Sequence, residues 1–121
     1  MYVDELIGDL LTTQEAADLL GAYRTRVNQY SRENRLVIIQ RDDRAYVPAG
    51  LLEELPEPVD SATHQPLENL RGTITLLRDS EFSAEEIAEW LWTPDEELGT
   101  TPIAALREGR HHQVNRIASA L

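Results

Sequence analysis

The hydrophobic and polar positions from residue 12 to residue 32 repeat with the period of an α-helix and predict two short helices joined at a glycine. Thr12 is a good N-cap, and Glu15 stands three residues later, which is the spacing of a capping box. The first helix has an apolar stripe that consists of Ala16, Ala17, Leu19 and Leu20. Gly21 follows, where a left-handed residue ends a helix without steric cost.

The second predicted helix spans residues 23–32 and is polar and basic outside one narrow apolar face. Val27 and Tyr30, at positions i and i+3, form that face. A small residue on the first helix and a glycine at the turn let two helices cross closely, as a helix-turn-helix requires. An ordinary helical hairpin with a glycine connector has the same pattern, so residues 12–32 alone leave both interpretations open.

Two short runs of strand-forming residues follow the second helix, at residues 36–40 (LVIIQ) and 45–47 (AYV). Between them lies the turn Arg41-Asp42-Asp43-Arg44, and an Asp pair suits a tight turn between strands. Pro48 ends the second run. These features predict the β-hairpin "wing" of a winged helix-turn-helix, with one Arg on each side of its tip.

Two weaker patterns flank this motif. Val3, Leu6, Ile7, Leu10 and Leu11 have a spacing compatible with a short helix, although Gly8 interrupts it at a cost of about 1 kcal/mol relative to Ala. Behind the wing, Leu51, Leu52 and Leu55 predict a short helix that closes the unit.

The run PEPVDSATHQP, from Pro56 to Pro66, holds three prolines among small and polar residues. Proline disfavours both helix and central strand, so an extended linker or surface loop is predicted. We therefore expect a winged helix-turn-helix DNA-binding domain at residues 1–56, a linker at 57–66 and a C-terminal helical domain at 67–121.

The C-terminal part is predicted to contain about four helices. Their apolar faces are Leu67, Leu70, Ile74 and Leu77; Ile87, Trp90 and Leu91; Ile103 and Leu106; and Val114, Ile117 and Leu121. Ser83 with Glu86 has the spacing of a second capping box, and Thr101 with Pro102 starts a helix that Gly109 ends. The fold class is therefore mainly α, with a winged helix-turn-helix followed by a helical subdomain.

Trp90 and Trp92 lie about 200° apart around their helix, so the two rings cannot face the same core. Packing of Trp92 on the following loop through Leu98 is the first interpretation. The alternative is an exposed anchor for another protein, because tryptophan is frequent in such contacts.

Three family resemblances accompany these patterns. Ala17, Gly21, Val27 and Tyr30 resemble the helix-turn-helix of MerR-like and excisionase-like regulators. The segment TPDEELGTTPIAALREG resembles the toxin-binding domain of ParS-type antitoxins. Taken together, the N-terminal motif and the segment WLWTPDEELGTTPIAALREGRHHQ are similar to small actinobacterial winged helix-turn-helix proteins, a family whose mycobacterial member is a Ser/Thr-kinase substrate. This last resemblance implies a DNA-binding, regulatory protein.

The net charge of −11 argues against nucleic-acid binding unless the positive residues are gathered in one place. Residues 22–46 contain six of the eleven basic residues, all Arg, against three acidic ones. This segment is the only net-positive part of the chain. It comprises the second helix and the wing, where a DNA-contacting surface is expected.

The remaining composition excludes several kinds of chemistry. The chain has no Cys, so it has no disulfide, thiolate metal site or cysteine nucleophile, which suits a cytoplasmic, nucleoid-associated protein. No run approaches the roughly eighteen apolar residues that a membrane span needs. His111 and His112 are adjacent and His64 lies in the predicted linker, so no metal site or other cofactor is expected. No nucleotide-binding or nucleophile motif occurs, and we predict that the protein is not an enzyme.

The leading hypothesis is a sequence-preferring protein that binds double-stranded DNA and regulates transcription. The side chains suited to base edges are Arg24, Thr25, Asn28 and Gln29. Those suited to phosphates are Arg26, Arg32, Arg35, Arg41 and Arg44. A homodimer is expected because one small motif buries little surface on DNA. The alternative is an antitoxin-like interaction module whose C-terminal helices bind a protein partner through Trp92 and Leu98.

Overall fold

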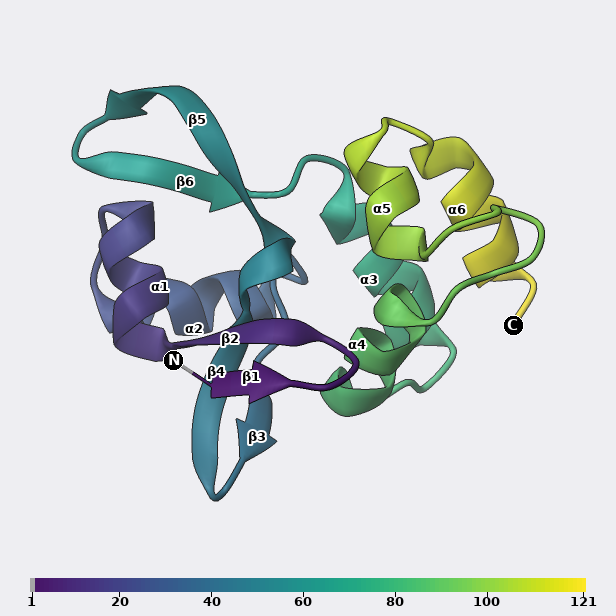
Figure 1. Ribbon diagram of the computed structural model, residues 1–121, viewed down its shortest axis with the longest axis horizontal. Coiled ribbons are helices and arrows are strands. Elements are labelled where there is room, and N and C mark those ends of the chain that lie inside the picture. The colour runs from purple at the N-terminus through teal and green to yellow at the C-terminus, as the bar shows by residue number, and fades with distance from the viewer. Residues whose placement is uncertain (1) are drawn as a thin grey trace.

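The computed structural model describes residues 2–121. Figure 1 shows the strands and the first two helices on one side of the molecule and the last four helices on the other. The helices of the first group are α1 (Thr13–Leu20) and α2 (Arg24–Arg32). Those of the second group are α3 (Leu70–Asp79), α4 (Ala84–Trp92), α5 (Pro102–Arg107) and α6 (His111–Ser119).

The helix-turn-helix forms at the predicted positions. The hydroxyl of Thr12 accepts a hydrogen bond from the Glu15 N–H (3.0 Å), and the Glu15 carboxylate accepts one from the Thr12 N–H (2.8 Å), so the capping box is confirmed. The same hydrogen bond from the Thr12 backbone lowers the pKa of Glu15. Gly21 ends α1 in the left-handed conformation, with φ of 63°. The helix boundaries predicted from the sequence are therefore correct here.

A four-stranded antiparallel sheet packs beside the two helices, with the strand order β1-β2-β4-β3. Its strands are β1 (Tyr2–Asp4), β2 (Gly8–Thr12), β3 (Ile39–Arg41) and β4 (Arg44–Pro48). The predicted wing is β3 and β4, joined by Asp42 and Asp43 at φ of 51° and 62°. A two-residue turn with both φ angles positive matches the twist of the strands that it joins.

The helix predicted within the first eleven residues is wrong, because this segment forms the β1–β2 hairpin. The Asp4 carboxylate accepts hydrogen bonds from the N–H groups of Leu6 and Ile7, which closes the turn, and Gly8 has φ of 83°. Strand β2 then pairs with β4, and Leu10 is fully buried. The pairing partner lies far along the chain, so the apolar spacing near the N-terminus could not distinguish a strand from a helix.

The segment behind the wing also differs from the prediction. Only residues Ala49–Leu51 are helical, as a single 3-10 turn (η1), and Leu52 and Leu55 belong to strand β5 (Leu52–Val59). Strand β5 pairs with β6 (Ala62–Pro66), so the predicted linker or loop is a two-stranded antiparallel hairpin. Both strands of a two-stranded sheet are edge strands, where proline is tolerated, and the register shifts between Glu54 and Val59.

The β5–β6 hairpin lies over α1, on the side opposite the wing (Figure 1). The turn between α1 and α2 approaches this hairpin closely. A Cβ atom on Gly21 would lie 2.6 Å from the backbone nitrogen of Ala62. Glycine is therefore required at position 21 both for its positive φ and for the space beside the hairpin.

Helices α4 and α5 begin at their predicted caps, whereas α3 begins at Leu70, so that Leu67 lies outside the helix. Ser83 and Glu86 form the second capping box, and the Thr101 hydroxyl accepts a hydrogen bond from the Ala104 N–H. Leu70, Ile74 and Leu77 are buried on one face of α3. Leu121 lies beyond α6 and is 55% exposed, so it does not extend that helix as predicted.

One cluster of buried apolar residues extends through both groups of elements. Further contacts join the two groups. The Arg107 guanidinium donates to the carbonyl oxygens of Gly50 and Leu52, and the Trp92 ring lies against Gly50. The fold is mixed α and β rather than mainly α, because two hairpins were not predicted. The division into domains at residues 57–66 stays a prediction.

Candidate nucleic-acid interface

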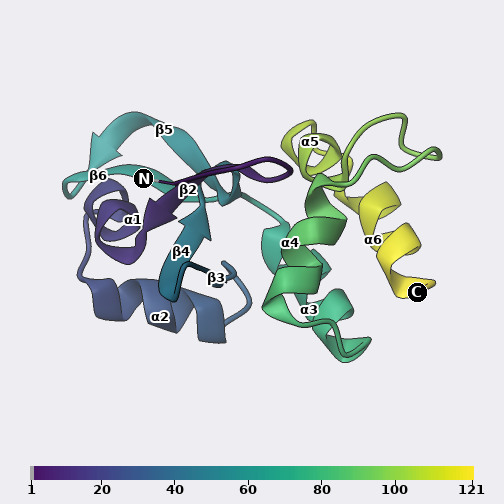
Figure 2. The same cartoon turned by 60° about the horizontal axis from the view of Figure 1, so that its bottom comes forward.

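The position of α2 is set by its narrow apolar face. Ala17 of α1 and Val27 of α2 are fully buried, and the two helices are in contact. Tyr30 is half-buried against the core. Because this face packs inward, α2 turns its polar residues to solvent along its whole length. Figure 2 shows α2 at the edge of the molecule, on the other side of α1 from the β5–β6 hairpin.

Six of the nine predicted DNA-binding residues form the exposed face of α2: Arg24, Thr25, Arg26, Asn28, Gln29 and Arg32. One of them has a partner at the end of the helix, because the Gln29 amide donates to the carboxylate of the C-cap residue Glu33 (3.0 Å). Arg26 lies with its guanidinium carbon 5.9 Å from the centre of the Tyr30 ring. The exposed face is thus long, polar and basic.

Arg24 and Arg26 lie on different flanks of α2. Arg24, Thr25 and Asn28 line a groove of about 380 Å³ whose other walls are Thr13 and Ala45 of the wing strand β4. Arg26 lines a separate groove on the flank near the Gly21 turn, together with Tyr23. The groove on the wing side therefore combines Arg24 with Asn28, whereas Gln29 lines the groove of Arg26 and Thr25 lines both.

The two arginines that flank the wing tip have different surroundings. The Arg44 side chain is exposed and forms no hydrogen bond or ion pair with any of residues 2–121. The Arg41 side chain is only 19% exposed. Its Nε donates to the Asp4 carboxylate (3.0 Å) and its Nη1 to that of Glu85, so Arg41 ties the wing to the β1–β2 turn and to α4.

The Asp4 carboxylate binds both Arg41 of the wing and the backbone of the β1–β2 turn. Hydrogen bonds from the Ile7 N–H, from Arg41 and from the Leu6 N–H hold the pKa of Asp4 below its ordinary value of 3.8, despite the opposing effect of burial. Asp4 is therefore ionised at neutral pH, and its charge offsets that of Arg41.

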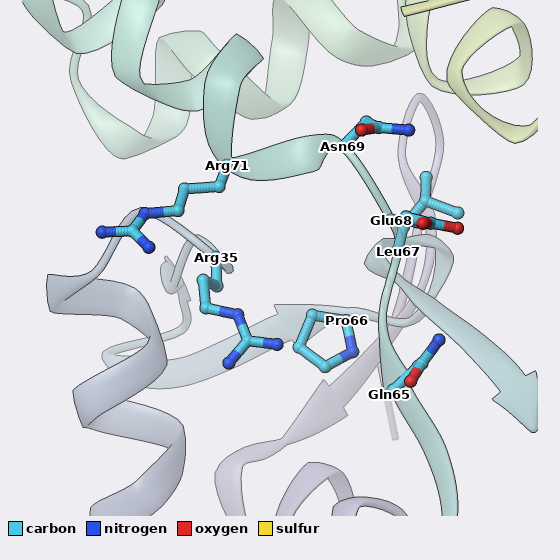
Figure 3. Close-up of a pocket in the computed structure, with 7 residues that line it drawn as sticks. All are labelled: Arg35, Gln65, Pro66, Leu67, Glu68, Asn69 and Arg71. Atoms are coloured by element: carbon cyan, nitrogen blue, oxygen red, sulfur yellow. The ribbon is translucent and has the colours of Figure 1, made fainter. Parts of the chain in front are cut away.

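The ninth predicted residue, Arg35, stacks over the Tyr30 ring with its guanidinium carbon 4.5 Å from the ring centre. It also lines a cavity of about 350 Å³ at the end of α2 (Figure 3). Arg71 of α3 lines the same cavity. The structure thus places eight of the nine predicted residues around α2 and the exposed wing tip, whereas Arg41 is held inside an ion-pair cluster.

Sequence reasoning missed two residues of this surface. Tyr23 is 86% exposed beside Arg26, at the start of α2. Its place directly before a basic helix was the available signal. Arg71 was also missed, and no local pattern could have indicated it, since it meets Arg35 only through the packing of α3 near the end of α2.

The residues predicted to bind a protein partner face mainly inward. Trp92 is half-buried and its ring would lie 2.6 Å from a Cβ atom on Gly50. Leu98 is 5% exposed. Its carbonyl oxygen accepts a hydrogen bond from Arg110 (3.0 Å). Contact of these two residues with another protein stays a prediction.

Within residues 2–121, no three His, Cys, Asp or Glu side chains come together in a way that could hold a metal ion. The rings of His111 and His112 lie side by side, with their centres 4.1 Å apart and their planes tilted by 41°. No helix of the described chain is long and apolar enough to cross a membrane.

Comparison with known proteins gives matches to both parts of the chain. Residues 4–52 match the family model described as "DNA-binding protein Rv2175c, wHTH domain". Residues 67–121 match "Rv2175c C-terminal domain of unknown function". The chain is 30% identical to "DNA-binding protein Rv2175c" of Mycobacterium tuberculosis (strain ATCC 25618 / H37Rv), over 87% of this chain and 75% of that relative. The NMR structure of Rv2175c aligns with a TM-score of 0.78 and 26% identity, over 99% of this chain and 85% of that structure.

Proposed function

The chain belongs to the Rv2175c family, and from this premise we propose that it is a DNA-binding regulator of transcription that inserts α2 into the major groove. The observation that carries the proposal is the exposed row of Arg, Thr and amide side chains along α2, beside the free Arg44 at the wing tip. The name of the mycobacterial relative supports it.

The two flanks of α2 suggest separate roles. Arg24, Thr25 and Asn28 share the groove next to the wing and belong to the first half of α2, which is the part of a recognition helix that contacts base edges. A guanidinium forms two hydrogen bonds with guanine, and an Asn amide does so with adenine. We assign sequence reading to these three residues and to Gln29 after release of its bond to Glu33.

The remaining basic residues are assigned to the phosphate backbone. Arg26 and Arg32 are exposed on α2, Arg35 follows the helix, and Arg44 extends from the wing. Arg41 has a supporting role, because its guanidinium already binds Asp4 and Glu85. The wing would therefore contact DNA through Arg44, while Arg41 holds the wing in place.

The test is a titration of fluorescent duplexes that contain genomic sites enriched by the protein in its host. We expect Arg24→Ala with Asn28→Ala to abolish the preference for enriched over scrambled duplex, since each lost base contact costs about 1–3 kcal/mol. Arg116→Ala is the matched control, because Arg116 pairs with Glu97 far from α2. Equal binding of enriched and scrambled duplex by the unmodified protein would overturn the proposal.

A homodimer is the expected binding form, as one helix-turn-helix covers a single half-site. Sedimentation of the protein with duplexes that carry one or two half-sites tests this. Two copies on the longer site support the dimer, and one copy on both duplexes contradicts it.

A further inference from the structure

The five arginines of residues 67–121 fall into two groups. Three are held by the protein: Arg107 by two backbone carbonyls, Arg110 by Leu98 and Gln113, and Arg116 by Glu97. The side chains of Arg71 and Arg78 form no hydrogen bond or ion pair with any of the described residues 2–121. Both of these belong to α3.

Arg71 and Arg78 project from the same face of α3, one helical turn on either side of Thr75. The Thr75 hydroxyl accepts a hydrogen bond from the Asn34 amide (3.2 Å), in the loop directly after α2. The face of α3 that carries both free arginines is therefore the face turned to the end of α2. Figure 2 shows α3 beyond that end.

A cavity of about 350 Å³ occupies this junction, and Arg35 and Arg71 both line it. Figure 3 shows that the two side chains come from different elements, Arg71 from α3 and Arg35 from the chain after α2, and that the Arg35 guanidinium points toward Pro66. Glu68 is the one acidic residue in the lining, and it forms no ion pair with either Arg. Arg78 lies outside this lining, but its Nε is buried and has no hydrogen-bond partner within residues 2–121.

Arg35 and Arg71 line this cavity without a carboxylate partner, and Arg78 lies about two helical turns further along α3. Like charges that share a cavity repel one another, and their N–H donors are left unused. An anion with several oxygens relieves both, since a guanidinium binds phosphate through two parallel hydrogen bonds. The chemistry of the junction therefore suits a phosphate group. The position of the cavity favours a phosphate of DNA in particular. Arg32, in the last turn of α2, and Arg35 extend the basic row of α2 to the cavity.

We propose that Arg71 and Arg78 of α3, together with Arg35, form a cleft that holds the DNA backbone beside the base pairs read by α2. The inference rests on the proposed function. It gives the C-terminal helices a part in DNA binding. The packing of their apolar faces does not depend on Arg71 or Arg78. The cleft holds phosphates and not bases, so it strengthens binding to every sequence equally.

The test measures binding of a mixed-sequence duplex of about three helical turns over a series of salt concentrations. The variant is Arg71→Gln with Arg78→Gln, and Arg107 and Arg110 stay unchanged because they hold the fold together. We expect the slope of log affinity against log salt to become shallower by about 2, since each phosphate contact contributes about 0.9. Arg116→Gln, on α6, should keep the unmodified slope.

Each other outcome decides against the cleft in a distinct way. An unchanged slope for the α3 double variant, with the preference for enriched over scrambled duplex lost in Arg24→Ala with Asn28→Ala, overturns the cleft and leaves the proposed function standing. Equal behaviour of every variant overturns both. NMR of the Arg Nε groups with inorganic phosphate identifies a small-anion site. A shift of the Arg71 signal there, with DNA binding unaffected by its substitution, also overturns the assignment to DNA. Thermal unfolding verifies that the variants fold.

Discussion

The wing and the β5–β6 hairpin have the same local geometry and opposite surroundings. Each has a two-residue turn with both φ angles positive, Asp42-Asp43 in the wing (51° and 62°) and Asp60-Ser61 in the other hairpin (48° and 70°). Residues 52–66 contain four acidic residues and no Arg, whereas Arg41 and Arg44 flank the wing turn. The two hairpins lie on opposite sides of α1 (Figure 1). The two hairpins therefore share a turn geometry, and they differ in the charge and the surroundings that determine whether they can contact DNA.

The neighbours differ as well. The wing belongs to a four-stranded sheet and is tied to Asp4 and Glu85 through Arg41. The β5–β6 hairpin is a sheet of two strands, which is marginal on its own. It is held against α1 by contacts such as the approach of Ala62 to Gly21. The position of β5–β6 should thus depend on the helix-turn-helix more than that of the wing does.

The largest expected effect comes from Gly21→Ala. A methyl group here meets the backbone of Ala62 at 2.6 Å, and alanine also strains the positive φ. The two effects together should destabilise the protein by about 3 kcal/mol. Gly109→Ala is the matched control, because Gly109 has φ of 80° with no atom within 4 Å of the added Cβ. Chemical denaturation of both variants separates strain from contact, and equal losses would contradict the close packing of the hairpin.

The next effect separates the two arginines of the wing. Arg41→Met removes hydrogen bonds to Asp4 and Glu85 and should cost about 1–2 kcal/mol of unfolding free energy. Arg44→Met should change stability by no more than about 0.5 kcal/mol, since Arg44 is exposed. DNA binding should show the reverse order at a temperature where both variants are folded. A stable Arg41→Met protein with weakened DNA binding would assign Arg41 to DNA instead.

A smaller effect is expected on the stability of the protein at low pH. The pKa of Asp4 is lowered by the Ile7 N–H and by Arg41, so its ionised form contributes stability that is complete above the ordinary value of 3.8. This contribution is lost as the pH falls from there through the lower pKa of the folded state. Asp4→Asn should therefore be less stable than the unmodified protein at pH 7, and the difference should shrink below pH 3.8. A constant difference over that range would contradict the role of the carboxylate charge.

The sequence predicted those parts of the molecule whose signals are local. The capping boxes at Thr12 and Ser83 and the turn at Asp42-Asp43 each lie within a few residues, and all three formed as expected. The β1–β2 hairpin was missed because its stability comes from pairing of β2 with β4, more than thirty residues away. The second hairpin had a local signal in Asp60-Ser61, but the prolines concealed it, since an isolated pair of edge strands tolerates them.

The candidate site divides in the same way. Helical periodicity sufficed to place the exposed face of α2, because Val27 and Tyr30 fix which side packs inward. The surroundings of single arginines could not be predicted. Arg41 meets carboxylates that are 37 and 44 positions away, and Arg71 reaches the cavity of Arg35 only through tertiary packing. Composition indicated where positive charge gathers but not which charges are already paired.

The smallest effect tests the turns themselves, where the two hairpins are most alike. Glycine adopts positive φ without strain, so Ser61→Gly and Asp43→Gly should each stabilise the protein, by about 0.5–1 kcal/mol at most. Ser61→Gly should gain more, because Asp tolerates the left-handed region better than Ser does. Thermal unfolding of both variants measures this order. A larger gain at Asp43 would mean that the sheet around the wing, and not the residue type, determines how much strain its turn carries.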